Sequence, residues 1–263
     1  VDGHKVAFGF LCGRDYETKH YVAKADTDQF IREREASRER ALAHCDSRRT
    51  IPVLGLVHAL QGVEELPLWK YFFSLLGIPT KDSESLKHAV SVGKKESGAE
   101  FCAPLTAFHG HVRQLSQSCD ALFLPVYLEK KDPGRQDRIR KYCYYTQFDA
   151  SLASAMLDKL EKKPQIISPV FKDRSNSRLV KEALYKALAT IYGDLIEKET
   201  LFSAWDKAQA FFERYQNELK ASWVPPSKDS IAVALLGRPY TVLPASMNKG
   251  IPAIFQKLGV PVS

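Results

Sequence analysis

Residues 50–57, TIPVLGLV, followed by residues 67–77, PLWKYFFSLLG, decide the fold. The first run is short and apolar, which is typical of a strand buried on both faces of a sheet. The second has the length and composition of a helix. Pro67 suits the first turn of a helix, and Gly77 suits the position just after its end. A buried strand followed by a helix predicts a βα unit.

The same alternation continues along the chain. Further strands are predicted over residues 121–128 (ALFLPVYL), 165–171 (QIISPVF) and 231–240 (IAVALLGRPY), the last being the strongest strand pattern in the sequence. Helices are predicted over residues 83–93, 103–116, 175–193 with a serine cap, 199–223, and 245–259 with an interruption at Pro252. This order predicts an α/β fold of two Rossmann-like, flavodoxin-like lobes, each a parallel sheet with helices on both faces, the second lobe being incomplete.

Three regions are expected from these patterns. Residues 1–49 form an N-terminal extension, residues 50–164 the first Rossmann-like lobe, and residues 165–263 a helical insertion and the start of the second lobe. A chain of 263 residues is long enough for two α/β domains. The second unit has fewer strands than a Rossmann-like sheet normally contains, so we expect a fragment, or a sheet that is completed elsewhere.

The composition narrows the class of protein. With 44% hydrophobic and 26% charged residues, the chain should fold as a soluble globular protein. No apolar run approaches the roughly 20 residues of a membrane span, and the start lacks a secretion signal, so we expect a cytoplasmic protein without membrane contact. The net charge of +7 is modest and mixed with acids. No aromatic-interleaved basic motif appears, so nucleic-acid binding is not expected.

Five cysteines are scattered through the sequence, an odd number without the dense spacing of a disulfide framework. Cys102 stands at the predicted start of a helix, where unpaired N–H groups favour a thiolate. Cys143 precedes another predicted helix, and Cys12 is followed by a glycine. Three thiolates could hold an iron–sulfur cluster, although a lone cysteine is more often a small buried hydrophobic residue than a ligand. We expect Cys45 and Cys119 to be structural.

Other residues suggest weaker sites. His109 and His111 could bind a metal, but residues two apart on a helix point to different faces, so packing is favoured. A loop after the second strand is basic and could meet phosphates of a nucleotide or coenzyme A, or could simply be solvated. Its cations are Lys130, Lys131, Arg135, Arg138, Arg140 and Lys141. Gly237, Arg238 and Tyr240 end the strongest strand and form a candidate anion site.

Several common enzyme motifs are missing from the sequence. It contains no Walker loop, no GxGxxG, no GxSxG and no HExxH. The sequence therefore argues against an autonomous ATPase, an ordinary NAD dehydrogenase, a serine hydrolase and a zincin.

Taken together, several segments resemble the activator-related components of 2-hydroxyacyl-CoA dehydratases, the CoA-substrate-specific enzyme activases. They occur in order as FGFLCGRDYE, TIPVLGLVHAL with PLWKYFFSLLG, EFCAPLTAFHGHV with ALFLPVYL, KYC, and LLGRPYTVLPASMNKGIPAIFQKLGV. The resemblance implies a dehydratase-subunit-like domain, separate from the actin-like ATPase domain that hydrolyses ATP and delivers a low-potential electron. Cys102 and Cys143 fall where such subunits place cluster cysteines.

The resemblance also implies the ligands and partners. These are a [4Fe-4S] cluster, a coenzyme A thioester, the actin-like activator ATPase domain and acyl-CoA dehydratase subunits. Two alternatives stay open. The domain could be a non-catalytic docking module that binds the activator or a dehydratase subunit through the helices of residues 151–223. It could also bind a small molecule or nucleotide at the turn of residues 237–240.

Overall fold

The computed structural model describes residues 51–132, 135–223, 231–260 and 262. Its strands are β1 (Leu54–Leu56), β2 (Thr80–Asp82), β3 (Ala121–Phe123), β4 (Val126–Asp132), β5 (Arg135–Lys141), β6 (Gln165–Ile167) and β7 (Val170–Asp173). Its helices are α2 (Gly62–Leu75), α3 (Ala89–Glu96), α4 (Ala103–Ser116), α5 (Tyr144–Gln147), α6 (Asp149–Leu157), α7 (Ser177–Tyr192), α8 (Lys198–Ala221), α9 (Pro239–Val242), α10 (Ala245–Asn248) and α11 (Ile251–Lys257), with a 3-10 turn, η1, at Gly193–Leu195.

A four-stranded sheet, which we call sheet A, forms the centre of the body in the order β2-β1-β3-β6. All of its pairings are parallel. The α/β class and the parallel sheet predicted from the sequence are therefore confirmed. β6 begins at Gln165, where the sequence suggested a new unit, and it is the fourth strand of this sheet.

Two of the predicted strands are each divided at a proline. ALFLPVYL becomes β3 and β4 on either side of Pro125, and QIISPVF becomes β6 and β7 on either side of Pro169. A proline has no N–H to donate to a neighbouring strand. The backbone therefore leaves sheet A at each of these two prolines and forms a new strand after it. β4 and β7 then run parallel in a second, mixed sheet, sheet B, in the order β5-β4-β7, with β5 antiparallel to β4.

Helices cover both faces of sheet A. On one face α2, α7 and α8 enclose a core that includes Leu54 and Phe123 from the sheet, together with Trp205 from α8. On the other face α4 and α6 pack over Leu122 and Ile166. The alternation of neighbouring strand residues between the two cores is what a buried parallel strand requires, and it explains the continuous apolar runs.

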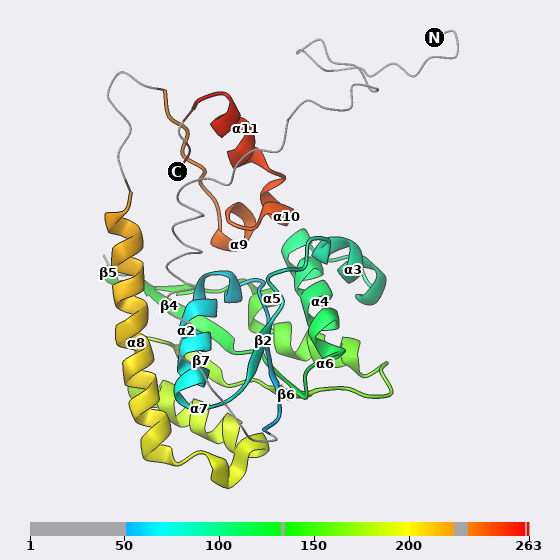
Figure 1. Cartoon of the computed structure of the whole chain (residues 1–263), viewed down its shortest axis with the longest axis vertical. Helices are drawn as coiled ribbons and strands as arrows, with labels where there is room; N and C mark the ends of the chain where they lie inside the picture. The colour runs from blue at the N-terminus through cyan, green and yellow to red at the C-terminus, as the bar shows by residue number, and fades with distance from the viewer. Residues whose placement is uncertain (1–50, 133–134, 224–230, 261, 263) are drawn as a thin grey trace.

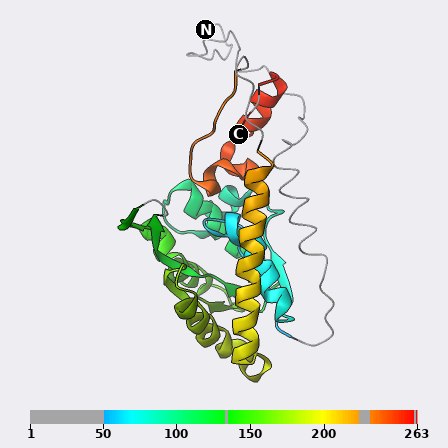
Figure 2. The ribbon, with the colours of Figure 1, turned by 90° about the vertical axis from the view of Figure 1, so that its left-hand side faces the viewer.

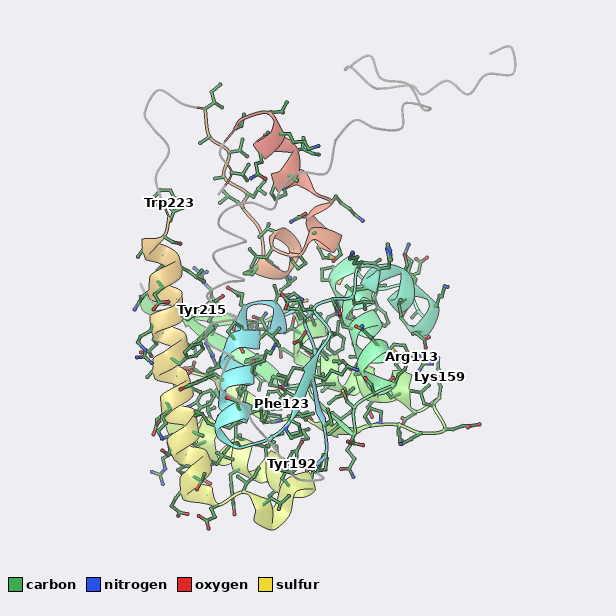
Figure 3. All side chains as sticks on the ribbon, in the orientation of Figure 1. Arg113, Phe123, Lys159, Tyr192, Tyr215 and Trp223 are labelled. Carbon is green, nitrogen blue, oxygen red and sulfur yellow. The ribbon has the colours of Figure 1, made fainter. Side chains whose placement is uncertain are left out.

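The arrangement of these layers can be followed in the figures. In Figure 1 α8 runs along one side of the body next to α2, whereas α3 and α4 lie on the other side. Figure 2 shows α8 on the outside of the body. In Figure 3 Phe123 lies within the body, and Trp223, 51% exposed, follows the upper end of α8.

Several helix boundaries differ from the sequence expectation. α2 begins at Gly62, so Pro67 lies inside the helix and not in its first turn. The region predicted as a helix from residue 83 is helical only from Ala89. The cap of α7 is Asn176, whose side chain accepts from the N–H of Leu179 at 3.2 Å, and not a serine. Asparagine is as good a helix cap as serine, which is why the pattern did not separate them.

Two larger expectations are wrong. The basic loop after the second strand is a β-hairpin of β4 and β5, in which Lys130 pairs with Arg140. Residues 231–240 do not form a strand: Val233 makes only an isolated parallel bridge with Val262. A strand exists only where neighbouring strands accept its hydrogen bonds, and the described residues provide one such contact. Leu236 is accordingly 93% exposed.

The segment of residues 231–260 still contacts the body. Tyr240 of α9 is buried in the core between sheet A, α4 and α6. Figure 1 shows α9, α10 and α11 above the upper ends of α2 and α4. None of the described helices combines the length and the apolar character needed to cross a bilayer.

Candidate functional site

Cys102 is the N-cap residue of α4, as the sequence predicts. Its backbone is extended, with φ −60° and ψ 150°, and its carbonyl accepts from the N–H of Thr106 at 3.0 Å. The thiol is exposed and does not cap the helix itself. Cys102 thus stands at the end of a 14-residue helix where the first N–H groups have no partner within the helix.

Cys143 occupies the corresponding position before the short helix α5. It too is exposed, and its carbonyl accepts from the N–H groups of Thr146 and Gln147 at 2.9 and 3.1 Å. The ring of Phe101, next to Cys102, meets the ring of Tyr145 edge to face, with centroids 5.7 Å apart. This contact brings the starts of α4 and α5 to the same region of the surface.

Arg238 reaches this region from the C-terminal segment. It is the N-cap residue of α9, and its Nη1 donates to the hydroxyl of Tyr240 at 2.8 Å. The guanidinium also lies close enough to Cys143 for the two side chains to interact electrostatically. The hydrogen bond to Tyr240, the charge interaction with its hydroxyl and the contact with Cys143 together raise the pKa of Arg238. An exposed thiol and a permanent positive charge are therefore adjacent.

The remaining residues of the predicted anion site are placed differently from expectation. A Cβ on Gly237 would lie 2.7 Å from Cγ1 of Val242, so this glycine leaves room for the Val242 side chain of α9. Tyr240 is buried and serves as a packing residue. Arg140 and Lys130 are exposed on the hairpin. Arg138 lies on β5, but its side chain is outside the described part of the structure.

The thiols give a partial fit to a metal cluster. Soft thiolates are the right donors for iron–sulfur clusters, and Cys102 and Cys143 are the two exposed cysteines among the described residues. Within the same residues no group of three His, Cys, Asp or Glu side chains could hold a metal. Cys12, the third predicted ligand, and Cys45 lie outside the described residues. Cys119 is buried, and burial raises its pKa, which suits the structural role expected of it.

The two histidines of α4 are core residues. His109 is 1% exposed and lies against the ring of Phe101, and burial lowers its pKa. Nδ1 of His111 is 3.0 Å from both the carbonyl and the hydroxyl oxygens of Ser83. Burial, with the charge of His58, lowers the pKa of His111 to about 4. Both rings are therefore neutral at neutral pH.

A small cavity lies at the carboxyl ends of β1 and β3, where Rossmann-like sheets bind ligands. It is lined by Val57, Leu124 and Asp149 among other residues, and its volume of about 30 Å³ suits ordered water, not a cofactor. Asp149 is 6% exposed, and burial raises the pKa of its carboxyl to about 8. The carboxyl oxygen accepts from the N–H of Ala150 at 2.6 Å.

Sequence reasoning missed Asp149. An aspartate at the start of a helix is normally an exposed first-turn residue, and the sequence around it, TQFDASL, gives no signal of burial. Its burial depends on the packing of α6 against α4, which is a tertiary property. The proximity of Arg238 to Cys143 was also missed, because the two residues lie 95 positions apart and belong to different segments of the chain.

The fold and the site together define a Rossmann-like α/β domain in which two cap cysteines and an arginine meet at one surface. The chain belongs to the family described as the CoA enzyme activase uncharacterised domain, whose model matches residues 53–263. The family resemblance read from the sequence is thereby confirmed. Comparisons with curated proteins and with solved structures give no significant match.

Proposed function

We propose that this domain is the iron–sulfur component of a CoA-enzyme-activase system and takes part in ATP-driven, low-potential electron transfer to an acyl-CoA dehydratase or reductase. The observation that supports the proposal is the exposed pair Cys102 and Cys143, with the positive charge of Arg238 close to the second thiol. Free, exposed thiols also suit a reducing compartment such as the cytoplasm.

In this proposal the cysteines bind the cluster, and the basic residues interact with negative charge. Cys102 and Cys143 supply two thiolate ligands, and Cys12 supplies a third. The bound [4Fe-4S] cluster provides one-electron chemistry. Arg238 places a positive charge beside Cys143, where it can offset the negative charge of a bound cluster. The basic hairpin, with Arg138 and Arg140, meets the phosphates of a coenzyme A thioester.

The proposed partners are those that the resemblance to the activase family implies. An actin-like activator ATPase domain would deliver the electron, and acyl-CoA dehydratase subunits would receive it or carry the substrate. Such transfers need close approach between protein surfaces. The exposed surface around the two cysteines leaves room for that approach.

A second candidate function is a non-catalytic docking module for the same partners. Exposed aromatic side chains beside Cys143 favour it: Tyr144 is 75% exposed and Phe148 is 57% exposed. Large aromatic residues contribute most of the energy at protein interfaces. α8 belongs to the helices of residues 151–223 predicted for docking, and its large apolar side chains Trp205 and Phe212 are buried against the body.

Anaerobic reconstitution with iron and sulfide tests the proposal and separates the two functions. We expect the wild-type domain to retain iron and sulfide and to absorb visible light, and we expect Cys102→Ser and Cys143→Ser to lose both properties. Cys119→Ala, which changes a buried cysteine of the same chain, is the control and should retain them. Wild-type protein that stays colourless and iron-free would contradict the cluster. Unchanged activity of the intact system with both serine variants, together with retained partner binding, would instead favour docking.

A further inference from the structure

The backbone is fixed on both sides of Cys143. Two planar peptide groups flank the Cα atom of this residue, and their orientation sets the direction of the bond that carries the thiol. The carbonyl of Cys143 accepts from the backbone N–H groups of Thr146 and Gln147 at 2.9 and 3.1 Å. The carbonyl of Tyr142, in the other peptide group, accepts from Nε2 of Gln147 at 2.7 Å. Gln147 therefore contacts both peptide groups next to the exposed thiol.

Cys102 is held in the same way by Thr106. The backbone N–H of Thr106 donates to the carbonyl of Cys102 at 3.0 Å, and its Oγ1 donates to the carbonyl of Phe101 at 3.3 Å. Thr106 and Gln147 are each the fourth residue after a cysteine. In both places the backbone N–H binds the carbonyl of the cysteine, and the side chain binds the carbonyl before it.

The two cysteines also share one backbone conformation. Cys102 has φ −60° and ψ 150°, and Cys143 has φ −55° and ψ 141°. Their segments, FCAPLT and YCYYTQ, have little in common apart from the aromatic residue before the cysteine. Two different sequences therefore place a cysteine in the same local geometry.

The side chains that hold these carbonyls are shielded from water. Thr106 is 4% exposed and Gln147 is half-buried, and water competes less for a shielded hydrogen bond. Tyr142 is anchored as well: its N–H donates to the carbonyl of Leu128 at 3.1 Å, and its ring meets the buried ring of Tyr127, with centroids 5.8 Å apart. The exposed thiol of the second cysteine is thus attached to a backbone that is fixed to the body.

A similar pair of contacts occurs at a helix start without a cysteine. Nδ2 of Asn248 donates to the carbonyl of Leu243 at 3.4 Å, and its backbone N–H donates to the carbonyl of Pro244 at 2.9 Å. Such bonds therefore hold the chain where it enters a helix, whatever the residue there. At the two cysteines they have the additional effect of fixing an exposed thiol.

We propose that Thr106 and Gln147 are the positioning residues of the cysteine pair, and that they fix the directions of the Cys102 and Cys143 thiols before a cluster binds. This inference rests on the proposed role of the two cysteines as ligands. Ligands that are already oriented lose less conformational freedom on binding. Removal of an outer contact that orients a metal ligand typically costs about 10–100-fold in metal affinity.

The rate of iron loss from the reconstituted domain tests the two residues. Thr106→Val and Gln147→Met keep the approximate size of each side chain and remove its donor. We expect each variant to lose iron to a chelator about tenfold faster than wild type, and we expect Thr106→Ser, which retains the hydroxyl, to behave like wild type. Thr190→Val is the matched control, because Oγ1 of Thr190 donates to the carbonyl of Ala187 at 2.7 Å in α7, a helix without a cysteine.

Two further measurements separate positioning from stability. Electron paramagnetic resonance of the reduced cluster responds to ligand geometry, so we expect altered g values in Thr106→Val and Gln147→Met and unchanged values in Thr106→Ser. Urea unfolding of the iron-free variants shows whether the fold is kept, and Gln147→Met supplies the test if the buried change at Thr106 impairs folding.

The outcomes distinguish this inference from the proposed function. A wild-type domain that takes up no iron would reject the proposed function and the positioning role with it. If the wild-type domain holds a cluster, a folded Gln147→Met variant with the wild-type rate of iron loss and the wild-type resonance signal would overturn the positioning role alone.

Discussion

The residues of the candidate site are far apart in the sequence, and the fold brings them to one region of the surface. Cys102 and Cys143 are remote in the sequence, yet the Phe101–Tyr145 ring contact brings their helix starts together. The cap position of Cys102 was predictable, because Pro104 follows two residues later in the first turn of the helix. The contact between Arg238 and Cys143 was not predictable, since it depends on how the C-terminal segment packs against α4 and α6.

Asp149 provides a prediction at this scale. The folded carboxyl keeps its proton up to a pH of about 8, whereas a carboxyl in the unfolded chain loses it near 3.8. The free energy of unfolding should therefore fall as the pH rises through this window. Asp149→Asn keeps the acceptor for Ala150 but cannot ionise. Since one pKa unit is worth about 1.4 kcal/mol, we expect the variant to exceed wild type in stability by about 2 kcal/mol or more at high pH.

Urea unfolding of both proteins at about pH 5 and about pH 9 measures this effect, because the lower value lies well below the folded pKa. The advantage of Asp149→Asn should be small at the acidic value and large at the alkaline one. If the free energy of unfolding changed with pH by the same amount in both proteins, Asp149 would be ionised in the folded protein at both pH values, and the prediction would be wrong.

At the scale of elements, the sequence predicted the helix and strand types better than their ends. α4 matches its prediction over the whole length, because its cap, its Pro104 and its apolar face agree. Residues 231–240 have the composition of a buried strand but make only one bridge, since strand formation depends on partners that a single segment cannot reveal. The hairpin of β4 and β5 was missed because its charged residues follow no apolar alternation.

The crossing of α3 and α4 gives a prediction for a glycine. A Cβ on Gly93 would lie 1.7 Å from the carbonyl oxygen of Thr106, and backbone atoms cannot move aside as a flexible side chain can. We expect Gly93→Ala to lower the free energy of unfolding by about 2–3 kcal/mol, despite the better helix propensity of alanine. Ser91→Ala, at an exposed position of the same helix, is the control and should change stability little. Equal stability of the two variants would mean that the helices do not cross this closely.

At the scale of the whole molecule, the same two segments of the chain contribute strands to both sheets, and the C-terminal segment packs back against the body. Prolines divide two apolar runs between sheet A and sheet B, and the C-terminal segment comes back to the body through Tyr240. The sequence indicated the α/β class and the helices on both faces. It did not indicate that the same apolar runs contribute strands to both sheets. A proline within such a run weakens the strand prediction but does not predict that a second strand, in another sheet, follows it.

Tyr240 should hold the C-terminal segment to the body. It is 7% exposed and is the residue of this segment that is buried in the core, with Leu243 packed against the same core, so removing its side chain should loosen residues 231–260 while leaving sheet A intact. We expect Tyr240→Ala to speed amide hydrogen exchange in that segment and to leave exchange in β1 and β3 unchanged. Leu236→Ala, at a side chain that is 93% exposed, is the matched control. Unchanged exchange in Tyr240→Ala would assign the attachment to other contacts.

Thiol footprinting of the unmodified domain tests the central claim most directly, namely that Cys102 and Cys143 serve together as cluster ligands. The protein is loaded anaerobically with iron and sulfide, alkylated with iodoacetamide, and analysed cysteine by cysteine by mass spectrometry, before and after removal of iron with a chelator. The account predicts that Cys102 and Cys143 are protected together when iron is bound and become reactive together when it is removed, with Cys119 unaffected. Equal alkylation of Cys102 and Cys143 in the two states would contradict it.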